Sequence, residues 1–300
     1  MIVHENYSAN DLLHRIKYLD SKVTHWLNNN LKLFNFENNK YTKNNYTSNY
    51  SIAEQIKPFC ELSFLYFFLN DNTEIKHSIK NIINDSLIKY DWTSILFTNA
   101  ELFNAFISLD SFSYLTNGYG IFSKEDIVNV SSIFLKNPYR MIEVQTYLAI
   151  VHEEKPKIHF NNLTILGKIK NVNEVSYMDI YSLTHEIFYI YFLDKFKKKE
   201  WFLYDLDYIY LKEYVFNLIS YVIFDGHIDL LIELILCVKL LNFDLNNYDI
   251  NLLVKSLDFI IENMNLEGGI IPHIEYDSNE FINLYHTTSI AKAMVDKWIE

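Results

Sequence analysis

Two histidines stand near the start of apolar runs, among residues that would otherwise form a hydrophobic core. His185 lies beside Glu186 in "LTHEIFYIYFL", and His286 lies in "YHTTSIAKAM". Imidazole and carboxylate groups transfer protons in general acid–base catalysis, and both also bind metal ions. We therefore expect His185 and His286 to be catalytic, as proton-transfer groups or as metal ligands, with Glu186 and Glu233 orienting them.

Other polar residues could bind a substrate beside these catalytic groups. The hydroxyls of the threonines next to the two histidines could donate hydrogen bonds to it. Glutamates near the start of other apolar runs could bind a neutral or cationic group. The expected substrate-binding set consists of Thr184, Thr287, Glu61, Glu101, Glu143 and Tyr189.

A further set of residues has the spacing of metal ligands. His227 and Asp229 stand two positions apart, as do His273 and Glu275, and each pair could supply two ligands to zinc or non-haem iron. The expected metal ligands are His227, Asp229 and His273. The zinc-protease pattern H-E-x-x-H is incomplete, because Tyr189 stands where the second histidine would be.

These residues also have structural explanations. A carboxylate in the first turn of a helix stabilises the helix dipole and the free backbone N–H groups. Thr98 and Glu101, for example, have the spacing of a capping box. A single histidine on an apolar helix is often a packed core residue. The argument for function is that glutamate recurs at the same place in several apolar runs.

Five apolar runs have a common layout. Each has a glutamate at its second position, and these glutamates recur at intervals of 40 to 47 residues. The runs are "CELSFLYFFL", "AELFNAFISL", "IEVQTYLAIV", "HEIFYIYFLD" and "IELILCVKLL", which contain Glu61, Glu101, Glu143, Glu186 and Glu233. A sixth run carries His286 and its threonines instead. Helices that are apolar nearly all round are buried on every side, and amphipathic segments alternate with them here.

This period and this alternation predict stacked helical hairpins. Because the two kinds of helix differ so sharply, we expect the hairpins to close into a ring with the buried helices inside. The sequence thus predicts a single all-α domain, a closed or nearly closed α/α toroid of five to six hairpins. Residues 1–50 would form an N-terminal helix and an Asn-rich loop from residue 28, and residues 51–300 would form the ring, with no clear outer helix in 153–178.

The helix pattern resembles the α/α-toroid superfamily over roughly residues 50–300. That superfamily contains terpene cyclases, lanthionine cyclases and many glycosidases and lyases. The segments LTH-x-x-FY and YHTT also resemble an uncharacterised family of bacterial toroid proteins. A third segment of that family, D-x-DLL-x-EL, has His227 in place of its first aspartate here. The resemblance implies parallel inner helices whose N-terminal ends, with the candidate residues, meet at one end of a central cavity.

Composition and charge argue against several classes of protein. The net charge of −12 argues against binding to nucleic acid or to an anionic membrane surface. Six glycines and four prolines are too few for an all-β fold. We expect neither a signal peptide nor a membrane span. The two cysteines, Cys60 and Cys237, lie in apolar runs, which is typical of reduced thiols in a cytoplasmic protein.

Together these features predict a cytoplasmic bacterial enzyme of specialised metabolism. It would modify a peptide or another natural product by acid–base chemistry or with the help of zinc or iron. Two alternatives stay open. One is a non-catalytic module that binds a peptide or partner protein in the same cavity, and the other is a carbohydrate-active toroid hydrolase or lyase.

Overall fold

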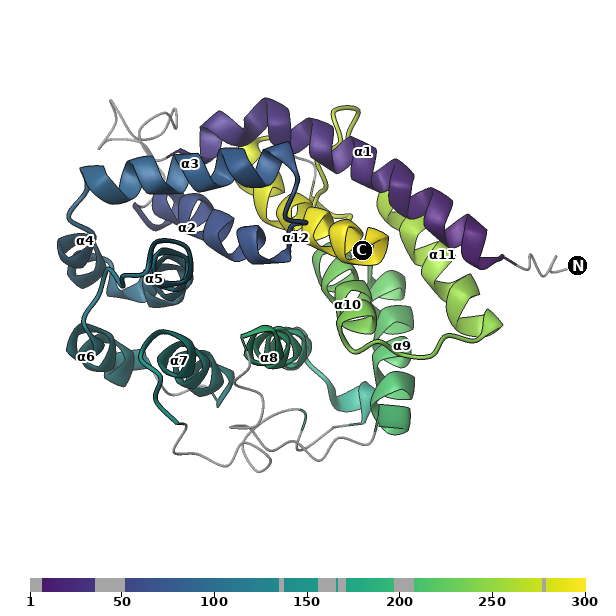
Figure 1. Ribbon diagram of the computed structural model, residues 1–300. Coiled ribbons are helices and arrows are strands. Elements are labelled where there is room, and N and C mark those ends of the chain that lie inside the picture. The colour runs from purple at the N-terminus through teal and green to yellow at the C-terminus, as the bar shows by residue number, and fades with distance from the viewer. Residues whose placement is uncertain are drawn as a thin grey trace, which may run out of the picture.

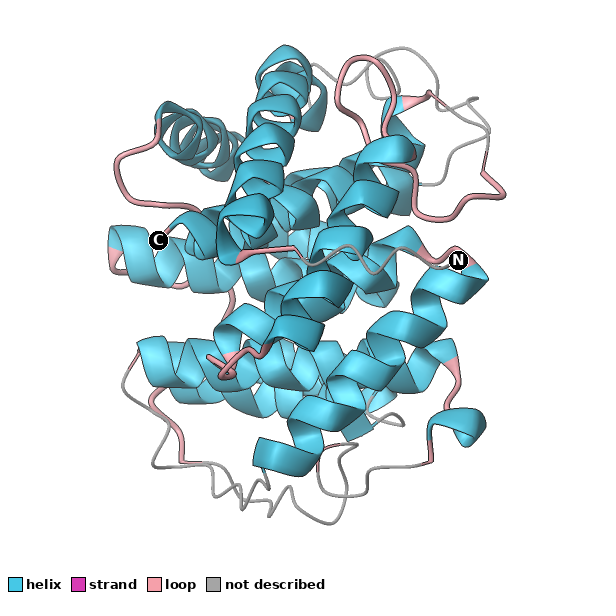
Figure 2. Ribbon diagram, turned by 90° about the vertical axis from the view of Figure 1, so that its right-hand side faces the viewer, coloured by secondary structure: helices cyan, strands magenta, loops and turns pink. Residues whose placement is uncertain are grey.

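The computed structural model describes residues 7–35, 52–134, 138–155, 166, 171–196, 208–276 and 279–300. These residues form helices joined by loops, and none of them lies in a strand (Figure 2). The α-helices are α1 (Ala9–Phe34), α2 (Ile52–Phe68), α3 (Glu74–Lys89), α4 (Trp92–Thr98), α5 (Phe103–Asn117), α6 (Lys124–Phe134), α7 (Pro138–Val151), α8 (Tyr177–Lys195), α9 (Tyr208–Asp225), α10 (Ile228–Leu240), α11 (Asn247–Glu262) and α12 (Phe281–Ile299). The prediction of an all-α fold is confirmed.

Six of these helices follow one another around the centre of the molecule (Figure 1). α2 packs on α5, α5 on α7, α7 on α8, α8 on α10, and α10 on α12, which in turn packs on α2. We call these six the inner helices, and they are the ones formed by the six apolar runs. In α10, every residue from Ile228 to Val238 is buried, because neighbouring helices cover it on all sides.

The amphipathic helices lie outside the inner ones. Helix α1 shows the physical reason, since its buried residues recur every three or four positions and form one apolar stripe. That stripe packs against α12 and α11. Side chains also define where such helices begin, as the capping boxes of Ser8 with Asp11 and of Asn246 with Asp249 start α1 and α11.

Helix α12 is fastened to its neighbours by buried charges. The Nζ atom of Lys292 lies 2.6 Å from carboxylate oxygens of both Asp20 on α1 and Asp296 on α12. Asp296 also accepts a hydrogen bond of 3.2 Å from the backbone N–H of Asn70, just after α2. A buried lysine is stable only with such partners, so this network holds the last helix against α1 and α2.

Some element boundaries differ from the expected ones. Helix α1 continues to Phe34, so the expected loop cannot begin at residue 28, and residues 36–50 of that loop lie outside the described residues. Thr98 ends α4 and Glu101 lies in the 3-10 helix η1 (Ala100–Leu102), so the two form no capping box. The 3-10 turn delays the start of α5, and Glu101 is exposed in front of it.

The expected irregular segment 153–178 is described only in part. Its described residues contain a single 3-10 turn, η3 (Val172–Glu174), and the first residues of α8. Residues 156–165 and 167–170 lie outside the described part of the chain. The described residues of this segment contain no outer helix, and the rest of that expectation falls on residues outside the described part.

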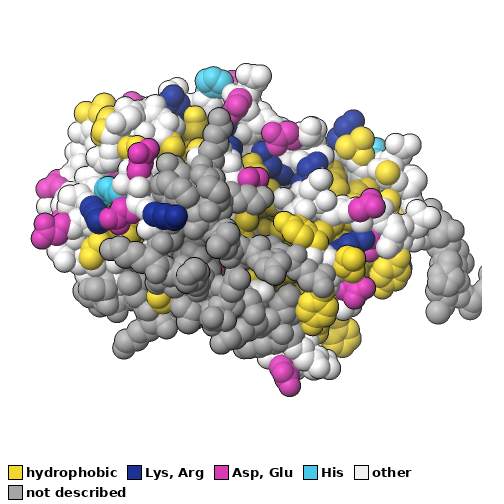
Figure 3. All heavy atoms as spheres, turned by 60° about the horizontal axis from the view of Figure 1, so that its bottom comes forward, with side chains coloured by type: hydrophobic (Ala, Val, Ile, Leu, Met, Phe, Trp, Pro, Cys, Tyr) yellow, Lys and Arg dark blue, Asp and Glu magenta, His cyan; other side chains and the backbone are white. Residues whose placement is uncertain are grey.

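Two surface properties bear on the partners of the protein. No helix in the described ranges combines the length and the apolar character needed to cross a bilayer. On the face shown in Figure 3, the described lysine and arginine side chains lie among acidic and apolar ones. The described part of that face therefore lacks the continuous basic stripe that is typical of nucleic-acid binding.

Candidate active site

Two buried carboxyl groups lie one helical turn apart on α10. Asp229 is 3% exposed and Glu233 is 1% exposed. Because α10 begins at Ile228, both residues fall in its first two turns, and the i, i+4 spacing puts them on one face. Buried acids are costly unless hydrogen bonds or protons neutralise them, so their partners decide what the pair can do.

Asp229 accepts hydrogen bonds from two neighbouring inner helices. The hydroxyl of Tyr181 on α8 lies 2.7 Å from one carboxylate oxygen, and the hydroxyl of Thr287 on α12 lies 2.9 Å from the other. Each oxygen of Asp229 therefore has a hydrogen-bond donor from a different helix.

The carboxyl group of Glu233 is held in its protonated form. Its carboxyl group accepts a hydrogen bond from the hydroxyl of Thr184 on α8. Burial, together with the negative charge of Asp229, raises the pKa of Glu233 to about 8. At neutral pH Glu233 therefore holds a proton, next to the carboxyl group of Asp229.

His286 on α12 lies between two carboxylates. Its Nδ1 donates a hydrogen bond of 2.8 Å to Glu61 on α2, and its Nε2 lies 3.7 Å from Asp229. Burial lowers the pKa of His286, but the charges of Glu61 and Asp229 outweigh burial and raise it to about 9. Burial likewise raises the pKa of Glu61, yet His286 and Lys57 bring it down to about 2. His286 is thus a cation at neutral pH.

His185 on α8, unlike His286, is neutral at neutral pH. Burial and, next, the charge of Arg140 lower the pKa of His185 to about 4, so the imidazole is neutral. Its Nδ1 lies 2.8 Å from the backbone carbonyl of Tyr181, which can only accept a hydrogen bond. The hydrogen is therefore on Nδ1 and the lone pair on Nε2, which is the form of a general base.

The structure brings together most of the residues singled out in the sequence. His185 and His286 each lie beside a different carboxylate of α10, since His185 Nδ1 is 3.8 Å from Glu233. Thr184 and Thr287 are buried, and their hydroxyls donate to Glu233 and Asp229. The two threonines thus position carboxyl groups, a role different from the expected contact with a substrate. We call the set of His185, His286, Glu61, Asp229, Glu233, Thr184, Thr287 and Tyr181 the proton cluster.

The remaining glutamates of the repeat lie elsewhere. Glu186 is fully buried and accepts a hydrogen bond of 3.0 Å from the backbone N–H of Leu166, so Glu233, and not Glu186, lies beside His185. Successive residues of a helix point about 100° apart around its axis. Here the side chain of His185, and not that of Glu186, lies at Glu233. Glu101 is exposed in η1. Glu143 on α7 pairs with Arg140 at 2.8 Å.

The expected metal ligands do not gather at one point. His227 caps the start of α10, where its Nδ1 accepts a hydrogen bond from the N–H of Leu230, and the Nδ1 of His273 accepts one from Glu275. The two rings lie 5.6 Å apart between centroids. Asp229, by contrast, points to the proton cluster. Among the described residues, the three side chains close enough to hold a cation are Asp229, Glu233 and His286, with atoms within 4.8 Å of one another.

Sequence reasoning missed Tyr181, Lys57 and Arg140. Tyr181 and Lys57 each stand four residues before a residue that was singled out, His185 and Glu61 respectively. They therefore lie on the same helix face, one turn earlier. A search for polar residues one turn before each candidate would have found both.

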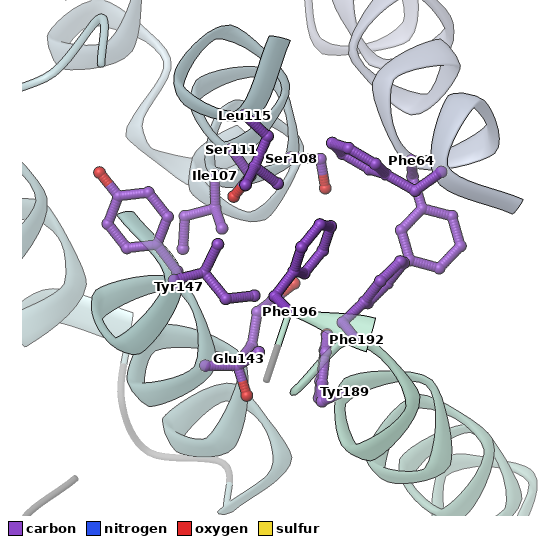
Figure 4. Close-up of a pocket in the computed structure, with 13 residues that line it drawn as sticks. Phe64, Ile107, Ser108, Ser111, Leu115, Glu143, Tyr147, Tyr189, Phe192 and Phe196 are labelled. Carbon is purple, nitrogen blue, oxygen red and sulfur yellow. The ribbon is translucent and has the colours of Figure 1, made fainter. Parts of the chain in front are cut away.

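An apolar pocket lies one helical turn further along α8 and α2 (Figure 4). It is lined by residues of α2, α5, α7 and α8, with Phe196 just after α8, and its empty space of about 460 Å³ includes open solvent. Phe64, Tyr189 and Phe192 border it, while the hydroxyl of Tyr147 points away from it and donates to Asp110. Tyr189, expected to bind substrate, thus lies in this pocket and outside the proton cluster.

Comparison with known proteins gives a family and no assigned activity. Neither the curated proteins nor the solved structures contain a match to this chain. The region that matches a family, residues 133–295, includes His185, Asp229, Glu233 and His286 but not α2 with Glu61. The match covers more than half of the chain, and the protein therefore belongs to the family described as Domain of unknown function (DUF6895).

Proposed function

We propose that the six inner helices form an α/α toroid and that its interior is an active site for proton transfer. The unbroken packing order from α2 round to α12 and back to α2 supports the toroid. The observation that carries the function is the carboxyl group of Glu233, which is buried beside Asp229 and is protonated at neutral pH. A buried carboxyl group whose pKa is raised towards neutrality often serves as a catalytic acid.

In this proposal Glu233 is the proton donor, because its raised pKa keeps the carboxyl group protonated at neutral pH. Nε2 of His185 is the acceptor. The positive charge of His286, whose side chain is 35% exposed, stabilises negative charge that develops on the substrate. The substrate gains one proton and loses one, so the reaction is an isomerisation or a ring closure that leaves its atomic composition unchanged.

Glu233 can regain its proton from His185, and a proton exchange with solvent then restores the tautomer of His185. After the reaction His185 carries a proton on both nitrogens and Glu233 is ionised. His185 Nδ1 lies 3.8 Å from the carboxyl oxygen of Glu233, so a small approach forms a hydrogen bond along which the proton passes. The pKa values of about 4 for His185 and about 8 for Glu233 direct that proton to the carboxylate. The hydrogen left on Nε2 then goes to solvent, and Nδ1, which faces the carbonyl of Tyr181, takes one up.

For the substrate we propose a peptide or another natural-product intermediate, and for the setting bacterial specialised metabolism. Both rest on the resemblance of the helix pattern. The free, buried thiols of Cys60 and Cys237 support a reducing cytoplasm as the place of action. The net charge of −12 supports a partner other than nucleic acid.

The test is a search for turnover in a mixture that contains the substrate. Purified protein is incubated with a peptide and small-molecule extract of the producing cells, and mass spectrometry follows features that convert to a new retention time at unchanged mass. We expect conversion by the wild type and by Glu262→Gln, an exposed control on α11, and its loss in Glu233→Gln. Equal conversion by folded Glu233→Gln and wild type would overturn the proposal.

A binding module is the second candidate, because hydroxyls of the protein itself already satisfy Asp229 and Glu233. It predicts that single substitutions weaken the retention of an extract component and that no feature is converted. The site geometry gives less support to a carbohydrate-active hydrolase or lyase. Glycosidase carboxylates flank the scissile bond, whereas Asp229 and Glu233 lie one turn apart on the same face of one helix.

A metal-assisted version of the chemistry also has an observation in its favour. Asp229, Glu233 and His286 offer two carboxylates and one imidazole, a ligand set that zinc and iron accept. Elemental analysis of protein purified without chelators separates the versions. One equivalent of zinc or iron would favour the metal, and turnover that persists after chelation would favour acid–base chemistry alone.

A further inference from the structure

We propose that the pocket between α2, α5, α7 and α8 binds an uncharged apolar arm of the substrate, carrying one hydrogen-bonding atom, while the reacting end lies at the proton cluster. This inference rests on the proposed function and names the class of substrate for it. The substrate would be a molecule with an aromatic or branched aliphatic group joined to a polar, reactive end.

The inner faces of three helices change from polar to apolar in the same direction. On α8, His185 is followed by Tyr189 and Phe192, one and two turns later. On α2, Glu61 is followed one turn later by Phe64. Since one turn advances about 5.4 Å, the pocket begins about that far from the proton cluster.

Helix α7 also changes from polar to apolar residues in this direction, and it forms the opposite wall of the pocket. Arg140 and Glu143 stand at its start, and Thr146, Tyr147 and Ile150 follow along the pocket. The polar ends of α2, α7 and α8 also interact electrostatically. The positive charge of Arg140 on α7 acts to lower the pKa of both His185 on α8 and Lys57 on α2. The pocket and the proton cluster are therefore neighbouring layers of one interior.

The walls of the pocket favour an arm without charge. The carboxylate of Glu143 is already compensated by the guanidinium of Arg140 at 2.8 Å. The other lining side chains are mainly aromatic and aliphatic, with the hydroxyls of Ser108, Ser111 and Thr146 among them. The empty space of about 460 Å³ includes open solvent, so the pocket suits one small arm and not a whole drug-sized ligand.

The hydrogen-bonding atom of the substrate arm would lie next to the hydroxyl of Thr146. Its side chain is 4% exposed, and its hydroxyl has no hydrogen-bond partner among the described residues, although the residue lines the pocket. A buried hydroxyl without a partner destabilises the folded protein, because it has lost its hydrogen bonds to water. A ligand atom that accepts or donates a hydrogen bond at this point removes that cost, and such an atom distinguishes the substrate from a plain hydrocarbon.

The test uses a neutral fluorescent probe, N-phenyl-1-naphthylamine, whose emission rises in apolar surroundings. Ser108→Phe places a ring in the pocket, and Ser220→Phe places the same ring on the exposed face of α9 as the matched control. We expect the probe to bind the wild type, Ser220→Phe and Glu233→Gln alike. Ser108→Phe should bind it about tenfold more weakly or worse and should also lose conversion of the extract component.

Thr146→Val keeps the proposal testable if Ser108→Phe does not fold, because it retains the shape of the side chain. It should bind the probe as the wild type does and should raise KM for the extract component. The inference is overturned if the wild type does not bind the probe, if both phenylalanine variants bind it equally, or if Ser108→Phe converts the component normally. Loss of conversion in Glu233→Gln beside any of these results would leave the proposed function standing.

Discussion

The imidazole of His286 on α12 lies 2.8 Å from the carboxylate of Glu61 on α2, so a charged hydrogen bond joins the last helix to the first inner helix. The same imidazole lies 3.7 Å from Asp229 on α10. One side chain thus connects three helices and forms part of the proton cluster. Substitutions in the proton cluster should change both stability and activity. The pH at which stability changes identifies the residue that titrates.

Replacing His286 by glutamine should cost stability mainly at mildly acidic pH. The pKa of His286 is raised from 6.5 to about 9, so its contribution is complete below pH 6.5 and is lost as pH rises through about 9. The pKa of Glu61 is lowered from 4.5 to about 2, so its contribution is complete above pH 4.5 and is lost as pH falls through about 2. The difference from wild type should reach about 1 kcal/mol between these limits, because the pair is partly exposed.

Urea unfolding of the wild type and of His286→Gln between pH 3 and pH 10 measures this difference. His77→Gln, on the exposed face of α3, controls for the loss of an imidazole as such. A difference that grows from pH 6 to pH 10 would show that His286 is not held as a cation.

Glu233→Gln should become more stable relative to the wild type as pH rises from about 4.5 to about 8. Below pH 4.5 the carboxyl group is protonated in both folded and unfolded chains, so nothing is lost. Above it the unfolded chain releases the proton while the folded chain keeps it up to about pH 8, and this penalises the wild type. Glutamine carries no such penalty and can still accept the hydrogen bond of Thr184.

The gain should be on the order of 2 kcal/mol, obtained from denaturant unfolding at pH 5 and pH 8.5. Glu262→Gln, exposed on α11, gives the baseline for removing one carboxylate. A wild type that gains stability over Glu233→Gln with rising pH would mean that the buried carboxyl group is ionised.

Thr146→Val should stabilise the protein by about 1 kcal/mol, because it removes a buried hydroxyl that lacks a partner among the described residues. Thr116→Val on α5 is the matched control, since the hydroxyl of Thr116 donates to the carbonyl of Phe112 at 2.7 Å. Thermal unfolding compares the two. A Thr146→Val variant that is destabilised as much as Thr116→Val would indicate that the hydroxyl is satisfied in solution.

Lys292→Ala should destabilise the protein by about 3 kcal/mol. Its ammonium group is buried between Asp20 and Asp296, and its removal leaves the buried carboxylate of Asp296 without its counter-ion. Lys255→Ala, at an exposed position of α11, removes a lysine without this network. If both variants lose the same small amount in chemical unfolding, the network does not hold α12 in place.

The sequence was sufficient to find the inner helices, because side chains that are apolar nearly all round can only be buried. It also identified His185, His286, Glu61 and Glu233, which recur or stand out at equivalent places. It failed where rotation about a helix axis decides the outcome. Glu186 and His185 are adjacent, yet only His185 lies at the proton cluster.

Other errors came from short-range shifts and from partners distant in sequence. The 3-10 turn at Ala100–Leu102 leaves Glu101 outside the interior, although its run resembles the others. Asp229 was expected beside His227, but its partners Tyr181 and Thr287 stand 48 and 58 positions away in the chain. No local pattern contains such a pairing, so the protonation of the cluster could be derived only from the folded structure.

The proton that Glu233 holds at neutral pH is the basis of the proposed function. Infrared spectroscopy detects it as the C=O stretching band of a protonated carboxylic acid, in difference spectra between wild type and Glu233→Gln. We predict that this band is present at pH 7, disappears with a midpoint near pH 8 and is absent from the variant. A wild-type spectrum without the band at pH 7, or a band that persists in Glu233→Gln, would contradict the assignment of Glu233 as the proton donor.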